Sequence, residues 1–358
     1  MAQLARRVMA LAAVAVLATL FVIPSAQARA TTPAGFFGLN FYFRDITAKD
    51  VFYLKASGAT TVRWIMNWQH VEPKRGTWNW SEPDAVVGDL AAHGIRVLPV
   101  MWGSPGWVAS RAVTPPISTQ AQRDAWSAYL RTTIRRYGPG GNYWSGAYRK
   151  QHPGKTGLPI HIWQAWNEPN LKGAMDPPAP DVYARLLTLS HTAIKQADPN
   201  AKVMFAGVLN APPNGGLTAW DFLHQVFQQP GAGNAFDIMA SHPYAPTVSA
   251  MLDALGRIRQ TMAAAGQGSK PLWITEIGWG SDPDAMGMEG QRDILIQAFN
   301  ALLQKRYVWR IGKVLWFNFR DPAGSNKNVC DFCTSGGLLS NAFQTKPSWS
   351  AFRSFTGG

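Results

Sequence analysis

Two glutamates stand at equivalent places in the sequence, each at the end of a short apolar run. Glu168 follows "IHIWQAWN" (160–167) and precedes Pro169, and Glu276 lies in "PLWITEIGW" (271–279). Two carboxyl groups can divide acid and base work between them, one holding a proton and the other a negative charge. The reaction that this pairing suits best is glycosidic bond cleavage, in which one carboxyl protonates the leaving oxygen and the other attacks the anomeric carbon or activates water.

For these glutamates to face each other, the runs that carry them must belong to one closed sheet. Eight runs rich in Val, Ile, Phe and Trp recur, at 36–43, 60–68, 95–102, 160–167, 202–210, 236–244, 271–279 and 313–319. Helices are predicted between them from the apolar periodicity, at about 47–57, 83–93, 119–137, 180–197, 218–229, 248–265 and 289–307. Apolar strands alternating with amphipathic helices predict a parallel sheet covered by helices. Eight units favour an α/β fold of the (β/α)₈ TIM barrel type over a doubly wound sheet, because no Gly-rich phosphate loop opens the first helix.

In such a barrel the chemistry is expected at the carboxyl ends of the strands. Besides the two glutamates, the strands bring further candidates to that end: Arg63, Trp102, Asn167, His242, Tyr244, Trp279 and Trp316. The tryptophans fit a carbohydrate, because the indole face stacks on the apolar C–H face of a pyranose ring. Metal-assisted lyases and isomerases also use paired acids, but they need three or more converging ligands, so we expect no metal and no cofactor.

Four blocks of the sequence, in order, resemble the retaining glycoside hydrolases of clan A. "WQAWNEPN" (163–170) looks like the acid/base motif that closes strand four, and "WITEIGW" (273–279) is similar to the nucleophile strand. "VRWIMNWQHVEPKRGTWNWSEPDAVV" (62–87) resembles the second-strand block, and "SHPY" (241–244) the sixth. The resemblance runs from about residue 36 to the end of the chain. Within the clan it is greatest to family 39 and bacterial exopolysaccharide hydrolases, with family 5 second.

The resemblance assigns a role to each polar candidate. It implies that Glu168 is the general acid/base, that Glu276 is the nucleophile, and that Asn167 binds the sugar 2-hydroxyl. Arg63 and a hydrogen bond from Tyr244 would favour the ionised nucleophile, while Glu168 must hold its proton near neutral pH.

The remaining candidates have roles that the sequence alone leaves open. His242 would orient Glu276 or contact substrate, or it is a core histidine. Trp316 is expected as the platform under the reacting sugar, with Trp102 and Trp279 at flanking subsites or in the wall. Glu72 is expected to be structural, with a substrate contact as the alternative.

The alternative interpretation of these residues is that they have a structural role and no catalytic one. Glu276 could be only the ion-pair partner of Arg63, and the chain could be a catalytically silent carbohydrate-binding protein on the same barrel. That alternative predicts a missing or misplaced carboxyl group, whereas this sequence keeps both. The expected partner is therefore a carbohydrate polymer or oligosaccharide substrate.

The beginning of the chain has the pattern of an export signal. Arg6 and Arg7 precede an apolar run over 8–23, and "PSAQARA" follows with small residues at the spacing of a cleavage site. We expect cleavage after Ala30, with Ala28 as the alternative, and an uncleaved anchor as a second one. The mature protein would be one catalytic domain over residues 31–358, a secreted or cell-wall associated monomer without a membrane span.

Charge and cysteine content add two expectations. The whole chain carries a net charge of +13, and the 31 cationic and 21 acidic residues beyond residue 30 leave +10. No Lys/Arg block or nucleic-acid motif accompanies this charge, so we expect no binding to nucleic acid but a preference for acidic polymers.

Cys330 and Cys333 are predicted to form a small disulfide that shapes a rim loop on the active face, a metal site being the alternative.

Overall fold

The computed structural model describes residues 32–212, 216–324 and 332–358. Residues 32–358 form one compact unit. The expected export signal over 1–30 and Cys330 lie outside the described residues, so the signal, its cleavage and the disulfide stay predictions. Within the described segments, no helix combines the length and the apolar character needed to span a bilayer.

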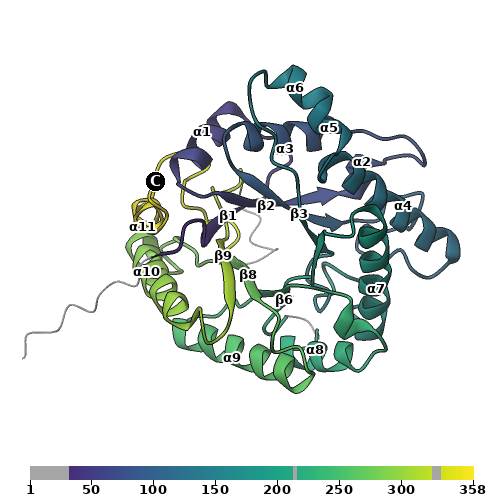
Figure 1. The fold of residues 1–358 in the computed structure, drawn as a ribbon. Helices are drawn as coiled ribbons and strands as arrows, with labels where there is room; N and C mark the ends of the chain where they lie inside the picture. Colours follow the sequence, from purple (N-terminus) through teal and green to yellow (C-terminus); the bar gives the residue numbers. More distant parts are fainter. Residues whose placement is uncertain (1–31, 213–215, 325–331) are drawn as a thin grey trace, which may run out of the picture. The chain divides into compact units, whose positions relative to one another are not determined.

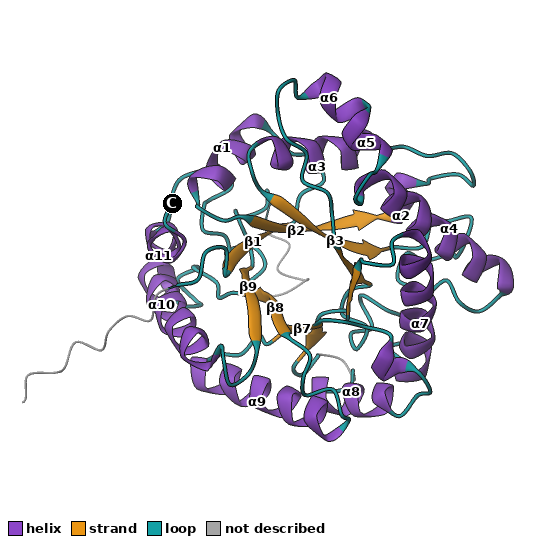
Figure 2. Cartoon of the chain, viewed as in Figure 1, coloured by secondary structure: helices purple, strands orange, loops and turns teal. Residues whose placement is uncertain are grey.

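The centre of the unit is a parallel sheet that curls into a barrel, seen along its axis in Figures 1 and 2. The strands are β1 (Phe37–Phe41), β2 (Thr61–Asn67), β3 (Arg96–Trp102), β4 (Ile162–Ala165), β5 (Lys202–Met204), β6 (Val208–Leu209), β7 (Met239–His242), β8 (Leu272–Ile277) and β9 (Ile311–Trp316). Their order is β5-β4-β3-β2-β1-β9-β8-β7-β6. A parallel bridge between Met204 and Ile238 joins β5 to the residues that precede β7 and closes the ring. The predicted (β/α)₈ fold is confirmed.

Helices surround this sheet, as Figure 2 shows. They are α1 (Ala48–Ala56), α2 (Trp68–Val71), α3 (Ser81–Ala92), α4 (Gln120–Tyr137), α5 (Asn142–Ser145), α6 (Ala147–Gln151), α7 (Pro180–Ala197), α8 (Ala219–Phe227), α9 (Val248–Ala264), α10 (Gly287–Lys305) and α11 (Pro347–Thr356), with a 3₁₀ turn at Ala232–Asn234. Threonine caps begin α1, α4, α8 and α9 by accepting a backbone N–H of the first turn. The seven helices predicted between strands are all present, with ends that differ by at most two residues.

The structure differs from the sequence prediction at the fifth strand. The run 202–210, predicted as one strand, divides into β5 and β6 with Phe205–Gly207 between them. β5 pairs with β4, whereas β6 pairs with β7. The interruption lies beside the candidate active site, where Gly207 has a specific packing role described below.

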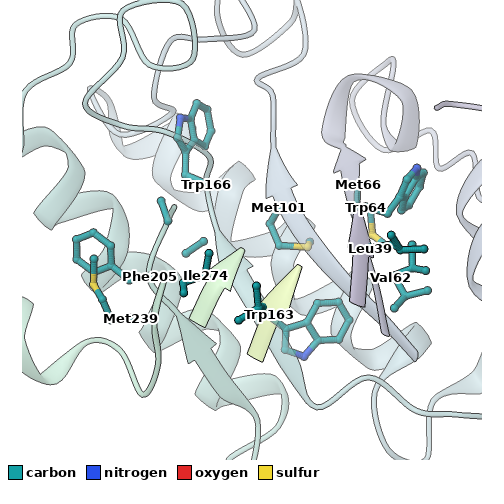
Figure 3. Close-up of a cluster of buried hydrophobic side chains, with 14 of the residues drawn as sticks. Leu39, Val62, Trp64, Met66, Met101, Trp163, Trp166, Phe205, Met239 and Ile274 are labelled. Carbon is teal, nitrogen blue, oxygen red and sulfur yellow. The ribbon is translucent and has the colours of Figure 1, made fainter. Parts of the chain in front are cut away.

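Two apolar clusters support the strands. The larger lies between the sheet and the helices; Figure 3 shows part of it, including Leu39, Val62 and the fully buried Trp163. The smaller is formed by side chains of the opposite face, Leu98, Met204, Ile238, Ala240 and Leu315, which fill the barrel interior. Burial on both faces explains why the strands read as near-continuous apolar runs. The polar side chains that contact the two glutamates come from β2, from the carboxyl end of β7 and from the residues that follow β7.

Candidate active site

The two predicted carboxyl groups meet at the carboxyl ends of β4 and β8, with His242 of β7 between them. His242 Nδ1 lies 2.7 Å from Glu168 Oε1, and His242 Nε2 lies 3.5 Å from Glu276 Oε1. One oxygen of each glutamate and a ring nitrogen of His242 all lie within 4.8 Å of one another. The side chains of Glu168 and Glu276 remain 15% and 10% exposed. A substrate at the barrel mouth can therefore reach both carboxyl groups.

The backbone around Glu168 adopts an uncommon conformation. Trp166 and Glu168 have φ angles of 77° and 42°, in the left-handed region that residues other than glycine rarely occupy. Two backbone hydrogen bonds hold them there, from Trp166 N to Met101 O of β3 (3.0 Å) and from Glu168 N to Gly207 O, between β5 and β6 (3.1 Å). Such strain persists where the surrounding structure determines it, and it is concentrated at functional sites. Here it turns the Glu168 side chain toward His242 at the point where β4 ends.

Arg63 of β2 connects the components of the site. It is 3% exposed, and its guanidinium donates to Gln164 Oε1 (2.7 Å), Asn40 Oδ1 (3.0 Å), Asn167 Oδ1 (2.6 Å) and Glu276 Oε1 (2.5 Å). A buried guanidinium is tolerated when its donors are satisfied in this way. Arg63 therefore fixes Glu276 and Asn167 relative to each other from beneath.

Glu276 is surrounded by groups that stabilise a negative charge. Oε1 accepts from Arg63, and Oε2 accepts from the Tyr244 hydroxyl at 2.8 Å. Burial and the charges of Glu276 and Glu168 raise the pKa of Tyr244 well above its ordinary value, so the phenol stays a donor. Two donors, one of them a cation, thus stabilise a negative charge on Glu276.

Glu168 has the opposite electrostatic environment. Burial raises its pKa to about 7, although the positive charge of Arg63 acts in the lowering direction. Its hydrogen-bonding partner His242 is fully buried, and burial lowers the pKa of that imidazole to about 3, so the ring is neutral. Glu168 thus exchanges a proton near neutral pH while its neighbour does not.

His242 occupies its position because Gly207 leaves room for the ring. A Cβ atom on residue 207 would lie 2.0 Å from His242 Nε2 and within 2.6 Å of two ring carbons. The break between β5 and β6 therefore serves the site twice, since Gly207 also accepts the Glu168 N–H. From the sequence, His242 could be a core residue, orient Glu276 or bind substrate. The structure places His242 in the core and in contact with Glu168.

The orientation of the Asn167 amide is set by its neighbour. Because Oδ1 accepts from Arg63, the Asn167 Nδ2 donors are directed away from the guanidinium. Asn167 is only half-buried. An NH₂ group at the mouth beside Glu168 suits the predicted contact with a sugar hydroxyl, which stays a prediction.

The structure does not support the predicted sugar platform at Trp316. That side chain is fully buried, its indole N–H donates to Gly336 O (2.9 Å), and its ring packs against Trp279 and Phe299. Because Phe299 belongs to α10, the Trp316 side chain faces the helix layer rather than the mouth. A sugar cannot stack on a surface that the core covers.

The two other predicted aromatic subsites differ from each other. Trp279 is 5% exposed and donates to Ala245 O (2.8 Å), so it belongs to the wall. Trp102, at the end of β3, is half-buried and donates to Ala174 O (3.1 Å), which leaves part of its ring available. Glu72 is buried and accepts from Trp68 Nε1 and Gly76 N at 2.8 Å, in agreement with its structural interpretation.

Several residues of the site were not selected from the sequence. Asn40 of β1 donates to Thr275 O (2.9 Å) and so links Arg63 to the nucleophile strand, and Gln164 of β4 accepts from Arg63. Tyr42 lies two residues beyond Asn40 and is 59% exposed. Desolvation of its hydroxyl and the charges of Glu276 and Glu168 raise its pKa. Period-two alternation from Asn40 to Tyr42 was the signal that could have found it.

Tyr42 begins a row of aromatic rings beside Glu276. Its ring centroid lies 5.9 Å from that of Phe317. The Phe317 and Tyr244 centroids are 6.3 Å apart, and those of Tyr244 and Phe332 are 4.5 Å apart. Phe332 belongs to the segment after β9 that was expected to form a rim. The neighbouring Cys333 is described and Cys330 is not, so the pairing of the two cysteines stays a prediction.

The three converging groups also have the composition of a metal site. Glu168, His242 and Glu276 each offer one donor atom within 4.8 Å of the others. Both oxygens of Glu276 already accept from Arg63 and Tyr244, and a cation there would be repelled by the guanidinium. The donor set therefore suits proton exchange better than metal binding, and the expected absence of a metal stays a prediction.

Solved structures with a similar fold come from several glycoside hydrolases. A family 39 glycoside hydrolase from the gut symbiont Bacteroides cellulosilyticus WH2 aligns with 90% of this chain at 20% identity and a TM-score of 0.65. The chain covers 63% of that protein. A monomeric beta-xylosidase from Caulobacter crescentus CB15 matches with 18% identity, a TM-score of 0.67 and coverages of 91% and 69%. Xylanase 10B from Thermotoga petrophila RKU-1 matches with 13% identity, a TM-score of 0.60 and coverages of 90% and 93%.

These likenesses establish the fold, and they agree with the resemblance to clan A and family 39 that the sequence motifs carry. A family model, described as the glycosyl hydrolase catalytic core, matches residues 149–345. The matched segment is more than half of the chain and contains Glu168, His242, Tyr244 and Glu276. By that match, and with paired carboxyl groups at the mouth of its barrel, this chain is an O-glycosyl hydrolase that belongs to the glycosyl hydrolase catalytic core family.

Proposed function

We propose that the protein is a retaining glycoside hydrolase that cleaves polysaccharide or oligosaccharide by double displacement. The observation that carries the proposal is the pairing of two carboxyl groups in opposite electrostatic environments. Glu276 lies against Arg63 and Tyr244, whereas burial raises the pKa of Glu168 to about 7. One carboxylate is thus prepared for attack and one carboxyl for proton donation.

In the first step, the protonated Glu168 gives its proton to the glycosidic oxygen while Glu276 attacks the anomeric carbon. The C–O bond to the leaving group breaks, and an ester bond forms between the sugar and Glu276. In the second step, the Glu168 carboxylate takes a proton from water, and the water oxygen attacks the anomeric carbon. Glu276 leaves as a carboxylate, and Glu168 is protonated for the next cycle.

The separation of the carboxyl groups supports retention over inversion. Retaining enzymes place the two groups about 5 to 5.5 Å apart, and inverting enzymes about 6.5 to 9.5 Å apart, because a water must fit between. Here one oxygen of Glu168 and one of Glu276 lie within 4.8 Å of each other. A direct attack by Glu276 is therefore favoured.

We expect the first-formed product to have the anomeric configuration of the substrate. Proton NMR of the anomeric region during the first minutes of hydrolysis, before mutarotation, measures this. The named neighbours make aryl β-xylosides and xylo-oligosaccharides the first substrates to test, followed by a panel of bacterial and plant polysaccharides. Formation of the opposite anomer would contradict the double displacement.

The pKa of Glu168 predicts the pH dependence of activity. The general acid works only when protonated, and its pKa is about 7, so kcat/KM should fall as the pH rises through 7. His242, with a pKa of about 3, is neutral on both sides of this limb and should not contribute to it. The measurement is kcat/KM from pH 4 to 9 on a substrate with a poor leaving group. If Glu168→Gln keeps the same limb at reduced activity, the limb belongs to another group.

Export and oligomeric state belong to the same proposal. The Arg6–Arg7 pair, the apolar run and the small residues before Ala30 support secretion or cell-wall association. The monomeric state belongs to the proposal without further support. The alternative function, a silent carbohydrate-binding protein, requires a missing or misplaced carboxyl group. Both groups are present and in contact through His242, which favours catalysis.

A further inference from the structure

Charge is distributed unequally between the two ends of the barrel. The connections from each long helix to the next strand, counted with the short helices α5 and α6 and with the first residue of each strand, contain two acids, Asp198 and Asp237. They contain eight cations: Arg96, Arg149, Lys150, Lys155, Lys202, Lys270, Arg306 and Arg310. The segments that follow the strands, on the side of the glutamates, contain eight cations and eight acids. More than half of the net charge of +10 therefore lies at the end of the barrel away from the active site.

The two acids at this end neutralise few of the cations. Asp237 is shared between Lys195 (3.4 Å) and Lys202 (3.3 Å), and Asp198 accepts the Asn200 N–H. Within the described part of the chain, no carboxylate pairs with Arg306 or Arg310. Burial and the positive charge of Arg310 lower the pKa of Arg259.

The segment between α10 and β9 adds an exposed aromatic tip to these cations. Tyr307 and Val308 are each 77% exposed and stand between Arg306 and Arg310. The Arg306 guanidinium lies over the Tyr307 ring at 4.3 Å from its centroid and donates to its hydroxyl at 3.0 Å. Because Arg306 Nη1 also donates to Leu303 O (3.2 Å), this guanidinium adds positive charge beside an exposed ring.

We propose that this end of the barrel is a docking surface for an anionic polysaccharide, separate from the active site. The surface consists of Arg96, Lys202, Arg306, Tyr307 and Arg310, which lie at the amino ends of β3, β5 and β9. A repeating polyanion can contact cations spread across the width of a barrel, and charge complementarity holds it without a preformed pocket. A bilayer would instead require a broad apolar stripe, and the apolar part here is two residues at one edge.

Docking at this end leaves the barrel mouth free to act on a chain. The enzyme would be concentrated on an acidic matrix while Glu168 and Glu276 face away from it. The inference does not depend on the assignment of the two glutamates, since binding can be measured without turnover.

The test compares two variants of the full chain that have the same net charge. The docking variant carries Arg96→Gln, Lys202→Gln, Arg306→Gln and Arg310→Asn, the last because asparagine tolerates the positive φ of residue 310. The control variant neutralises four exposed cations on the helices: Lys49→Gln, Lys55→Gln, Arg185→Gln and Arg257→Gln. Affinity for polygalacturonate is measured by co-sedimentation at 50 mM and 300 mM NaCl, with neutral dextran as the blank.

We expect the docking variant to bind polygalacturonate about tenfold or more weakly at 50 mM salt, and the control variant within about twofold of the unmodified protein. Tyr307→Ala alone should weaken binding without changing its salt dependence. Activity on a small aryl glycoside should be the same in the docking variant. Equal weakening in both quadruple variants would overturn the proposal, because net charge alone would then explain binding. A second outcome would also overturn it: the docking variant loses binding to anionic vesicles that contain about one third phosphatidylglycerol but binds polygalacturonate as strongly as the unmodified protein. All proteins share residues 1–31, so any contribution of that segment cancels.

Discussion

Replacing Glu276 by glutamine is expected to lower kcat/KM at least about 10⁴-fold, since the substitution removes the nucleophile. The amide is a poor nucleophile and cannot carry the negative charge that Arg63 and Tyr244 stabilise. Glutamine has the shape of glutamate, and its carbonyl oxygen can still accept from Arg63, so the fold should survive. The measurements are steady-state kinetics on an aryl glycoside and the unfolding temperature of both proteins.

The chain offers a matched control for this experiment. Glu72 is another buried glutamate near the barrel mouth, but its oxygens bind Trp68 and the backbone of Gly76. Glu72→Gln should lower stability and leave kcat within about tenfold. Removing either charge from a buried network costs stability, so unfolding data alone do not separate the two. If Glu276→Gln keeps wild-type turnover, or if Glu72→Gln loses as much, the nucleophile has been assigned wrongly.

The positions of Glu168 and Glu276 were predictable because they depend on topology. A parallel barrel brings the carboxyl ends of all its strands to one face, so two acids 108 residues apart in sequence are brought together once the strands are recognised. The alternation of apolar runs and amphipathic helices was enough for that recognition. Local side-chain packing was therefore not needed to locate the site.

The environment of each side chain was harder to predict. The alternation of side chains along a strand predicts on which face of the sheet a residue lies, but the end of a strand can twist or break. Trp316 closes β9 and was expected at the mouth, yet its ring packs between Trp279 and Phe299. The interruption of the strand at Gly207 could not be predicted from the apolar run 202–210, because the residue that needs the space is a histidine on another strand, His242. The sequence prediction also missed α11, which follows the long segment after β9.

The chemistry of Glu168 gives the second large expected effect. Glu168→Ala should reduce hydrolysis of unactivated glycosides about 10²- to 10⁴-fold, because no other group beside the leaving oxygen can donate a proton at neutral pH. His242 cannot substitute for it, since burial keeps that imidazole neutral. Formation of the glycosyl-enzyme should persist on 2,4-dinitrophenyl glycosides, whose leaving group needs no proton. The second step should then be slow, because no base activates water.

Azide should rescue the Glu168→Ala enzyme and distinguish the two glutamates. The truncation leaves space beside His242 and Asn167, and azide is a nucleophile that needs no general base. It should attack the sugar held on Glu276 and give a glycosyl azide of the same anomeric configuration as the substrate. Glu276→Ala should instead admit azide to the opposite face of the sugar and give a glycosyl azide of inverted configuration. A glycosyl azide of inverted configuration from Glu168→Ala would mean that Glu168 is the nucleophile and Glu276 the acid/base. Failure of azide to rescue either variant would contradict a covalent intermediate on either glutamate.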